Sequence, residues 1–375
     1  YDDFRGSFHK CLPQNELGEV DRAAYRRLRR ALERGYPEDF DAIPLSTRSD
    51  RRLANPQGAL ARNLTGIDSH ATRIRPAPAF ASAETAAEVG EVYWHALLRD
   101  VPFNQYTSHP LAEAAVTDLN RFSATVGPQV GGQITGATLF RGPTPGDLTG
   151  PYVSQFLWKT VPFGLARIEQ LYSSPAAGDD FMTSADEWLR IQRGRTPIRI
   201  PELGRPRYIN DARALGEYVH VDVLSQAYLF AGLIALDMGA FGVATYDGNP
   251  SQEGFTSLGG PDFLDSLWHV GNLSLRAAWF QKWSAHRRLR PEMYAGRVHF
   301  TYSGDRDYDV HDDILSSDAV VRLTSVNGTA FLPMQFPEGS PTHPAYPAGH
   351  ATVAGSCCTV LKAFLDEEMV INDPV

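Results

Sequence analysis

Apolar residues recur at spacings of three and four along five long stretches of the chain. This periodicity is typical of α-helices that bury one face. It predicts helices over residues 23–34, 84–98, 111–122, 214–238 and 265–289. We therefore expect a mainly α-helical protein, a bundle of helices joined by long connections that are rich in proline and glycine.

The fourth of these stretches is apolar on nearly every side between Val221 and Leu236. Helices of this kind are expected in the middle of a bundle rather than on its surface. Two connections, 127–151 and 327–348, exceed the roughly 12–15 residues usual for loops in compact domains, and loops of that length tend to be functional. The second of them carries the sharpest motif in the sequence.

Composition is that of an ordinary globular protein, with 43% hydrophobic and 21% charged residues among 375. No compositional break marks a linker, so we expect one domain over residues 1–375. The net charge of −9 disfavours general binding to nucleic acid or anionic membranes, and three cysteines are too few for a disulfide framework. No apolar run approaches the ~18 residues of a membrane span. We expect a soluble protein whose compartment is left open, with a secreted or periplasmic location compatible.

The segment from Trp279 to Glu292 concentrates basic side chains, among them Lys282 and Arg290. The periodicity places these cations at the C-terminal end of a long helix that Pro291 ends. Such cations have a purely structural explanation, since they offset the negative end of the helix dipole by ~0.3–1 kcal/mol each.

A second segment begins at Ser340 and contains two histidines, His343 and His350, before a helical stretch over 351–365. Gly349 thus lies at a helix N-terminus, where free backbone N–H groups and the dipole favour an anion. A single histidine in such a turn is more often structural than catalytic.

Taken together, the two segments indicate an anion-binding site more strongly than either does alone. Fixed Lys and Arg charges, a helix N-terminus and two histidines are what a tetrahedral oxyanion such as phosphate or vanadate requires. We therefore expect the side chains of Lys282 and Arg290 to lie within ~12 Å of the N-terminal end of the helix that begins near His350, close enough to share one ion.

The spacing of these residues resembles a known family. Lys282 and Arg290-Pro291 form the pattern Lys-x7-Arg-Pro, and His343 to His350 form His-Pro-x-Tyr-x-x-Gly-His. Both resemble the algal and cyanobacterial bromoperoxidase branch of the vanadium haloperoxidases, which are related to phosphatidic-acid-phosphatase-type acid phosphatases. The resemblance extends over most of the chain, through Asn55-Pro-Gln-Gly, Asp68-Ser-His-Ala, Leu139-Phe-Arg-Gly-Pro, Gly150-Pro-Tyr-Val-Ser-Gln-Phe, Asp180-Phe-Met-Thr and Phe331-Leu-Pro-Met.

The resemblance implies a helical bundle of the haloperoxidase and acid phosphatase type, with vanadate as the cofactor. Lys282 and Arg290 match the cations that hold the vanadate oxygens, and Gly349 matches a backbone N–H donor to one of them. Lys282 would also act in catalysis, by polarising the bound peroxide.

The remaining matches concern protons and halide. His350 matches the catalytic acid–base histidine that hydrogen-bonds an apical oxygen, a task suited to a group that titrates near neutrality. Trp279 matches a position on the halide side of the pocket, and His343 is a further candidate for the halide pocket.

Two departures from the family pattern stand out. Ala348 occupies a position where the family commonly has a serine that contacts vanadate. The third family motif, an Arg followed six positions later by the axial vanadium-binding His, is missing after His350, because residues 351–375 contain neither Arg nor His. Upstream, Arg62 and His70 are too widely spaced to replace it. We therefore expect a C-terminal segment, or a second chain, to complete the site.

The activity implied is vanadate-dependent oxidation of bromide, and also of iodide or chloride, by hydrogen peroxide. The hypohalous acid formed would halogenate small organic substrates, and the resemblance favours a homo-oligomer. A vanadate-inhibitable acid phosphatase of the same superfamily and an inactive homologue remain as alternatives.

Overall fold

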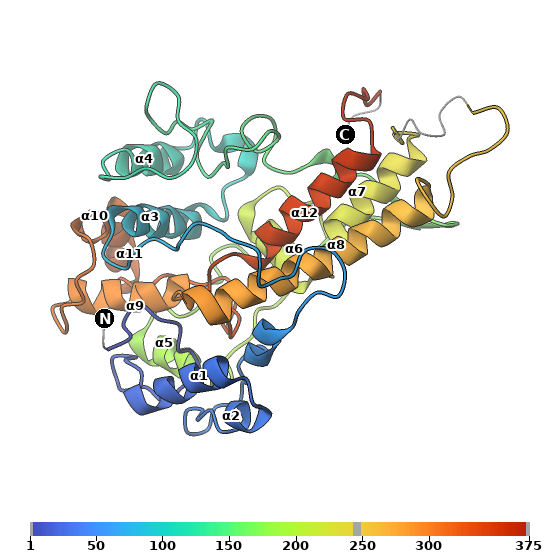
Figure 1. The fold of residues 1–375 in the computed structure, drawn as a ribbon. Helices are drawn as coiled ribbons and strands as arrows, with labels where there is room; N and C mark the ends of the chain where they lie inside the picture. The colour runs from blue at the N-terminus through green and yellow to red at the C-terminus, as the bar shows by residue number, and fades with distance from the viewer. Residues whose placement is uncertain (1–2, 243–248, 373–375) are drawn as a thin grey trace.

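The computed structural model describes residues 3–242 and 249–372, which form twelve α-helices and one short β-hairpin (Figure 1). The predicted mainly α class is confirmed. The helices are α1 Arg22–Arg34, α2 Pro37–Asp41, α3 Ala83–Leu98, α4 Pro110–Leu119, α5 Ala185–Gln192, α6 Ala212–Val221, α7 Gln226–Asp237, α8 Gly260–Phe280, α9 Pro291–Tyr302, α10 Asp312–Leu315, α11 Asp318–Asn327 and α12 Gly349–Phe364. Strands β1 Val161–Phe163 and β2 Ala166–Ile168 pair antiparallel. Three 3₁₀ turns, η1 Pro56–Leu60, η2 Phe103–Gln105 and η3 Gln155–Leu157, and one π-helical turn, η4 Gln281–His286, complete the set.

The long helix α8 is the axis of the molecule (Figure 1). Helices α7 and α12 lie along it at one end, and η4 and α9 follow its other end. The main core lies around α1, α3, α4, α5, α9 and α11, where the large side chains of Trp94, Trp188 and Trp283 are almost wholly buried. A smaller cluster of Phe263, Leu267, Val353 and Cys357 joins α8 to α12.

Local sequence explains where several helices start and stop. Asp21 caps α1 by accepting the N–H of Ala24 at 2.7 Å, and Gly35 ends that helix in the left-handed conformation with φ 77°. Ser82 caps α3 in the same way through the N–H of Thr85. The helices predicted over 23–34, 84–98 and 111–122 correspond to α1, α3 and α4.

The prediction of one central helix over 214–238 is wrong. The chain forms α6 and α7, which meet at 98°, because Asp222 is extended at φ −68° and ψ 158°. Most of α7 is half-exposed rather than central, and its buried residues are Gly232, Ile234 and Ala235. The break thus falls at the one carboxylate inside the apolar stretch from Val221 to Leu236.

The prediction of one helix over 265–289 is also wrong at its end. Helix α8 runs only to Phe280, η4 continues it to His286, and Arg287 terminates the run in the left-handed conformation with φ 46°. Pro291 does not end this helix. It occupies the first position of α9, where its missing N–H costs nothing, and Arg290 is the N-cap residue of that helix.

No single helix in the described ranges has both the length and the apolar character to cross a membrane, although the bent pair α6 and α7 meets both requirements when taken together.

Two of the quoted motifs anchor the connection before His343. Phe181 and Met334 exchange both backbone hydrogen bonds, at 2.8 and 2.9 Å, so that the segment Asp180-Phe-Met-Thr pairs with Phe331-Leu-Pro-Met. Phe181 and Leu332 are buried in this region. The long connection predicted over 327–348 is therefore fixed to the core at its start and reaches the site from a defined direction.

Candidate functional site

Lys282 lies in the first turn of η4 with its side chain fully buried. Its Nζ donates to the carbonyl oxygens of Pro344 at 2.7 Å and Ala345 at 3.2 Å. No carboxylate in the described part of the chain pairs with it. Burial, and then the charge of Arg290, lower the pKa of Lys282 to about 7. The ammonium group thus lies in a region that has too little negative charge to hold it fully protonated.

Arg290 contributes a second cation to the same region. Its Nε is buried and has no hydrogen-bond partner among the described residues. Burial lowers the pKa of Arg290, while the carboxylate of Glu292 opposes that shift. As the N-cap residue of α9, Arg290 stands at the positive end of a helix, where a cation is unfavourable. The dipole explanation offered by the sequence therefore fails for this residue, because Arg290 begins a helix instead of ending one.

Aromatic ring contacts and hydrogen bonds to backbone carbonyls hold the loop over residues 343–346 against the end of α8 and against η4. The ring centroids of Trp279 and His343 are 4.7 Å apart, and those of His286 and Tyr346 are 4.9 Å apart. Burial, followed by the charges of Lys282 and Arg290, lowers the pKa of His343 to about 3. The structure therefore brings Lys282, Arg290 and His343 within one electrostatic environment.

Trp279 is fixed from its other side by a quoted motif. Its Nε1 donates to the carbonyl of Asn55 at 3.0 Å, and Asn55 begins η1 in the left-handed conformation with φ 45°. The Asn55-Pro-Gln-Gly motif thus sets the position of the indole ring that covers His343.

A buried ion pair that lies near Arg290 was not predicted from the sequence. Lys10 and Glu292 are both fully buried and lie 3.2 Å apart. Lys10 also donates to the carbonyls of Glu338 and Ser340, and the Ser340 hydroxyl donates to Glu292 at 2.6 Å. Although burial works in the opposite direction, the charges of Lys10 and Arg290 lower the pKa of Glu292. This network ties the N-terminal segment to the first turn of α9 and to the connection that leads to His343.

Gly349 and His350 open α12, as the sequence predicted. The N-cap residue is Ala348, so no side chain caps the first N–H groups of this helix. His350 is half-exposed, and its Nε2 lies 3.2 Å from the Oδ1 of Asp222 at the junction of α6 and α7. Asp222 was missed by the sequence analysis, although a lone acid inside an apolar run could have marked it.

The predicted approach of Lys282 and Arg290 to this helix end stays a prediction. Gly349 lies four positions after Ala345, whose carbonyl accepts from Lys282. A chain of that length spans at most about 14 Å. His350 itself contacts Asp222 rather than either cation.

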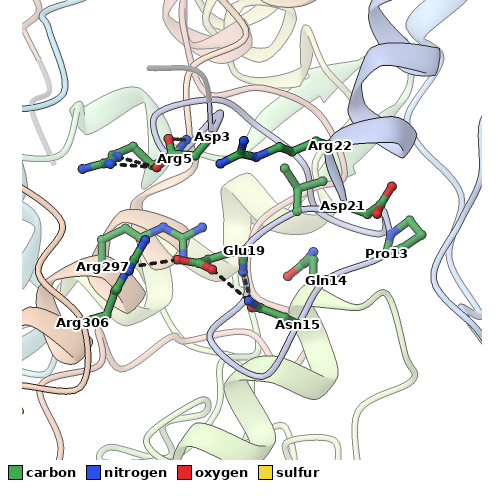
Figure 2. Close-up of a pocket in the computed structure, with 11 residues that line it drawn as sticks. Asp3, Arg5, Pro13, Gln14, Asn15, Glu19, Asp21, Arg22, Arg297 and Arg306 are labelled. Atoms are coloured by element: carbon green, nitrogen blue, oxygen red, sulfur yellow. Dashed lines mark hydrogen bonds and ion pairs between the residues drawn. The ribbon is translucent and has the colours of Figure 1, made fainter.

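A separate pocket of about 550 Å³ lies between the N-terminal segment and α9 and contains none of the predicted site residues (Figure 2). Its central carboxylate, Glu19, accepts from Asn15 at 2.8 Å and from Tyr308 at 2.9 Å, and it pairs with Arg306 at 3.4 Å. The central carboxylate of this pocket is therefore already paired with its neighbours.

Comparisons with known proteins identify the family of the chain. No family model matches the chain. A vanadium-dependent bromoperoxidase of Ascophyllum nodosum is 34% identical over 388 aligned residues, which cover 97% of this chain and 69% of that protein. A vanadium-dependent bromoperoxidase of Corallina pilulifera is 30% identical over 98% of this chain and 76% of its own length. The chain belongs to the vanadium-dependent bromoperoxidase family. The predicted family and enzyme class are thereby confirmed.

The bromoperoxidase fold is confirmed in three dimensions. The chain superposes with a TM-score of 0.94 and 34% identity on the solved homohexameric vanadate-dependent bromoperoxidase of Ascophyllum nodosum. The match takes in 99% of this chain and 66% of the solved one. Within this bromoperoxidase fold, Lys282 lies at the start of η4 and Arg290 at the N-cap of α9, and the charge of Arg290 contributes to the lowered pKa of Lys282.

Proposed function

We propose that the protein oxidises halide, bromide first, with hydrogen peroxide and a vanadate cofactor, giving hypohalous acid that halogenates small organic molecules. One observation carries the proposal. Lys282 is fully buried near a second cation, the partly buried Arg290, and has no carboxylate partner among the described residues. An oxyanion is the kind of ligand that such a pair would hold.

The residues present fit vanadate. Arg290 has a buried Nε free to donate, Lys282 has an ammonium group that an anion would keep protonated, and the N-terminus of α12 has no side-chain cap. These three groups would hold the oxyanion, with Gly349 donating its backbone N–H. Vanadate, when bound, would supply a Lewis acid that activates peroxide toward attack by halide.

His350 would hold and move the proton. Its Nε2 faces Asp222 at 3.2 Å, which leaves Nδ1 to exchange a proton with the bound ligand. A carboxylate in this position would orient the imidazole ring through a hydrogen bond. Asp222 is thus proposed as the residue that positions His350.

Trp279 and His343 would form the halide side of the pocket. The Nδ1 of His343 lies 3.1 Å from the carbonyl of Pro344, and its pKa of about 3 leaves the imidazole neutral near pH 7. His343 therefore cannot attract halide by its own charge. The positive charges of Lys282 and Arg290 would attract the halide ion. The ring of Trp279 would limit the size of the halide that the pocket accepts.

A further residue that would hold the vanadate is proposed to come from outside these 375 residues. Residues 351–375 contain no histidine, and the described residues hold no group of three His, Cys, Asp or Glu side chains placed for a metal ion. We propose that an Arg-x5-His segment, C-terminal or on a second chain, completes the site in a homo-oligomer.

The decisive assay is peroxide-dependent bromination of phenol red by the native full-length protein, with and without added vanadate. We expect bromination that requires vanadate and bromide, and no hydrolysis of p-nitrophenyl phosphate. Hydrolysis of that ester without bromination would instead assign the site to an acid phosphatase. Loss of both activities in a protein that binds vanadate would assign it to an inactive homologue.

A further inference from the structure

A second cavity shares a wall with the cation pair. It measures about 320 Å³ and lies between α3 and the start of α9. Arg290 and Ala345 both line it, and the carbonyl of Ala345 is the one that accepts a hydrogen bond from Lys282. A molecule in this cavity would therefore be separated from Lys282 by a single residue and would touch Arg290 directly.

The walls of the cavity suit a flat apolar ring. Val89, Val92, Leu289 and Pro291 supply aliphatic surface. Phe80 and Tyr294 line another part, with ring centroids 5.0 Å apart and planes inclined at 51°. Pockets for small organic ligands combine this size and lining with a few polar groups that fix orientation.

Two carboxylates of α3 face the cavity and differ in their partners. Glu88 is held by Arg288 at 2.6 Å. Glu91, almost one turn further along, has no hydrogen bond or ion pair among the described residues. Burial, and then the charge of Glu88, raise the pKa of Glu91 to about 7. Glu91 is thus a polar group in an apolar wall that still needs a partner.

We propose that this cavity binds the organic substrate, an electron-rich single aromatic ring that carries one hydroxyl or N–H group. The ring would lie against Phe80 and Tyr294, and its polar group would hydrogen-bond the Glu91 carboxyl. The assignment rests on the proposed function, because it places the ring beside the residues that would generate hypobromous acid.

The reaction expected there balances without a further reagent. A ring carbon attacks the bromine of hypobromous acid, and the bromine–oxygen bond breaks with its electron pair leaving on oxygen. The ring carbon then loses its proton to that oxygen. The products are the aryl bromide and water.

Binding is tested first, without peroxide or vanadate, by titrating phenol into the full-length protein and following ligand-detected NMR. Glu91→Ala should weaken phenol binding at least fivefold, and Val92→Phe, which fills the cavity, should abolish it. Glu84→Gln is the matched control, because Glu84 begins the same helix and lies outside the cavity lining. It should bind phenol as the unaltered protein does. Equal binding by a folded Glu91→Ala protein would overturn the proposal.

Turnover separates this proposal from the proposed function. Iodide oxidation to triiodide needs no organic substrate, so Glu91→Ala should keep the iodide rate while raising the KM for phenol bromination at least fivefold. Glu91→Gln keeps the size and a hydrogen bond, and should restore most of the lost affinity. An unaltered protein that binds phenol but does not oxidise iodide would refute the proposed function alone. An unchanged phenol KM in Glu91→Ala would show that hypobromous acid reacts outside this cavity.

Discussion

Two lysines of this protein are fully buried, and their surroundings differ in one respect. Lys10 faces the carboxylate of Glu292 at 3.2 Å and donates to two carbonyls. Lys282 also donates to two carbonyls but has no carboxylate among the described residues. A buried charge costs several kcal/mol unless it is paired. The charge of Lys10 is therefore neutralised within the fold, whereas Lys282 lacks the negative charge that a bound oxyanion would supply.

Removing the paired lysine should have the largest effect on stability. Lys10→Met leaves the buried carboxylate of Glu292 without its partner, so the free energy of unfolding should fall by about 3–5 kcal/mol. Urea denaturation followed by circular dichroism measures this loss. The double variant Lys10→Met with Glu292→Gln should regain part of it. A loss below ~1 kcal/mol in the single variant would mean that the pair is not a structural unit.

Removing the unpaired lysine should act on activity instead. Lys282→Met removes a buried cation of low pKa, so stability should be unchanged or higher. Bromide oxidation by the full-length enzyme should fall by roughly 10²–10³-fold, the usual cost of losing a preorganised charge. Lys362→Met, on the exposed face of α12, is the control and should leave both properties unchanged. Retained activity in Lys282→Met would remove this residue from the proposed mechanism.

Anion binding should depend on pH through Lys282. Sulfate keeps its charge between pH 5 and 9 and can serve as the probe in calorimetric titration. Below pH 7 Lys282 is protonated and affinity should be level, whereas above about 7 binding must first protonate it. Affinity should then fall by up to about tenfold per pH unit. Lys282→Met should abolish this slope, and an equal slope in that variant would assign it to another group.

The pKa shift of Lys282 also determines how the stability of the protein changes with pH when no anion is bound. The folded pKa of Lys282 lies below its value of 10.5 in the unfolded chain. The unfolded state therefore binds more protons between about pH 7 and 10, and this residue's contribution makes the fold more stable as pH rises through that window.

Restoring a hydroxyl at the start of α12 should have the smallest effect. Ala348→Ser supplies the missing N-cap, which should stabilise the protein by about 1 kcal/mol. If the hydroxyl also reaches the anion, sulfate should bind about fivefold more tightly, equivalent to another ~1 kcal/mol. Thermal unfolding with and without sulfate separates the two contributions. A more stable protein with unchanged sulfate affinity would place this helix end away from the site.

The sequence predicted the elements whose signals are local. The helix starting at Gly349 was evident because its loop and apolar periodicity are contiguous. Helix α9 was missed because nearly all of it is buried, from Glu292 to Val298, so no polar face gives it a period. The role of Pro291 was misread because a proline marks a helix boundary without saying on which side the helix lies.

Contacts between residues far apart in the sequence could not be predicted, for a different reason. Lys10 and Glu292 are separated by 282 positions, and only the folded chain brings them together. The contact of Asp222 with His350 likewise depends on the bend between α6 and α7. Spacing within one segment can be read from the sequence, whereas the partner of a buried charge is decided by tertiary packing.

The π-helical turn η4 has a consequence for how this protein can vary in length. A π turn carries one residue more than an α turn would need over the same path. Deleting one residue between Lys282 and His286 would restore a regular helix locally. Because the π turn spans the same path with one residue more, the helix before it and the segment that leads to Arg290 would stay nearly in place. The loss of one residue should therefore be tolerated within η4 as long as Lys282 is kept, whereas a deletion between η4 and α9 should displace Arg290.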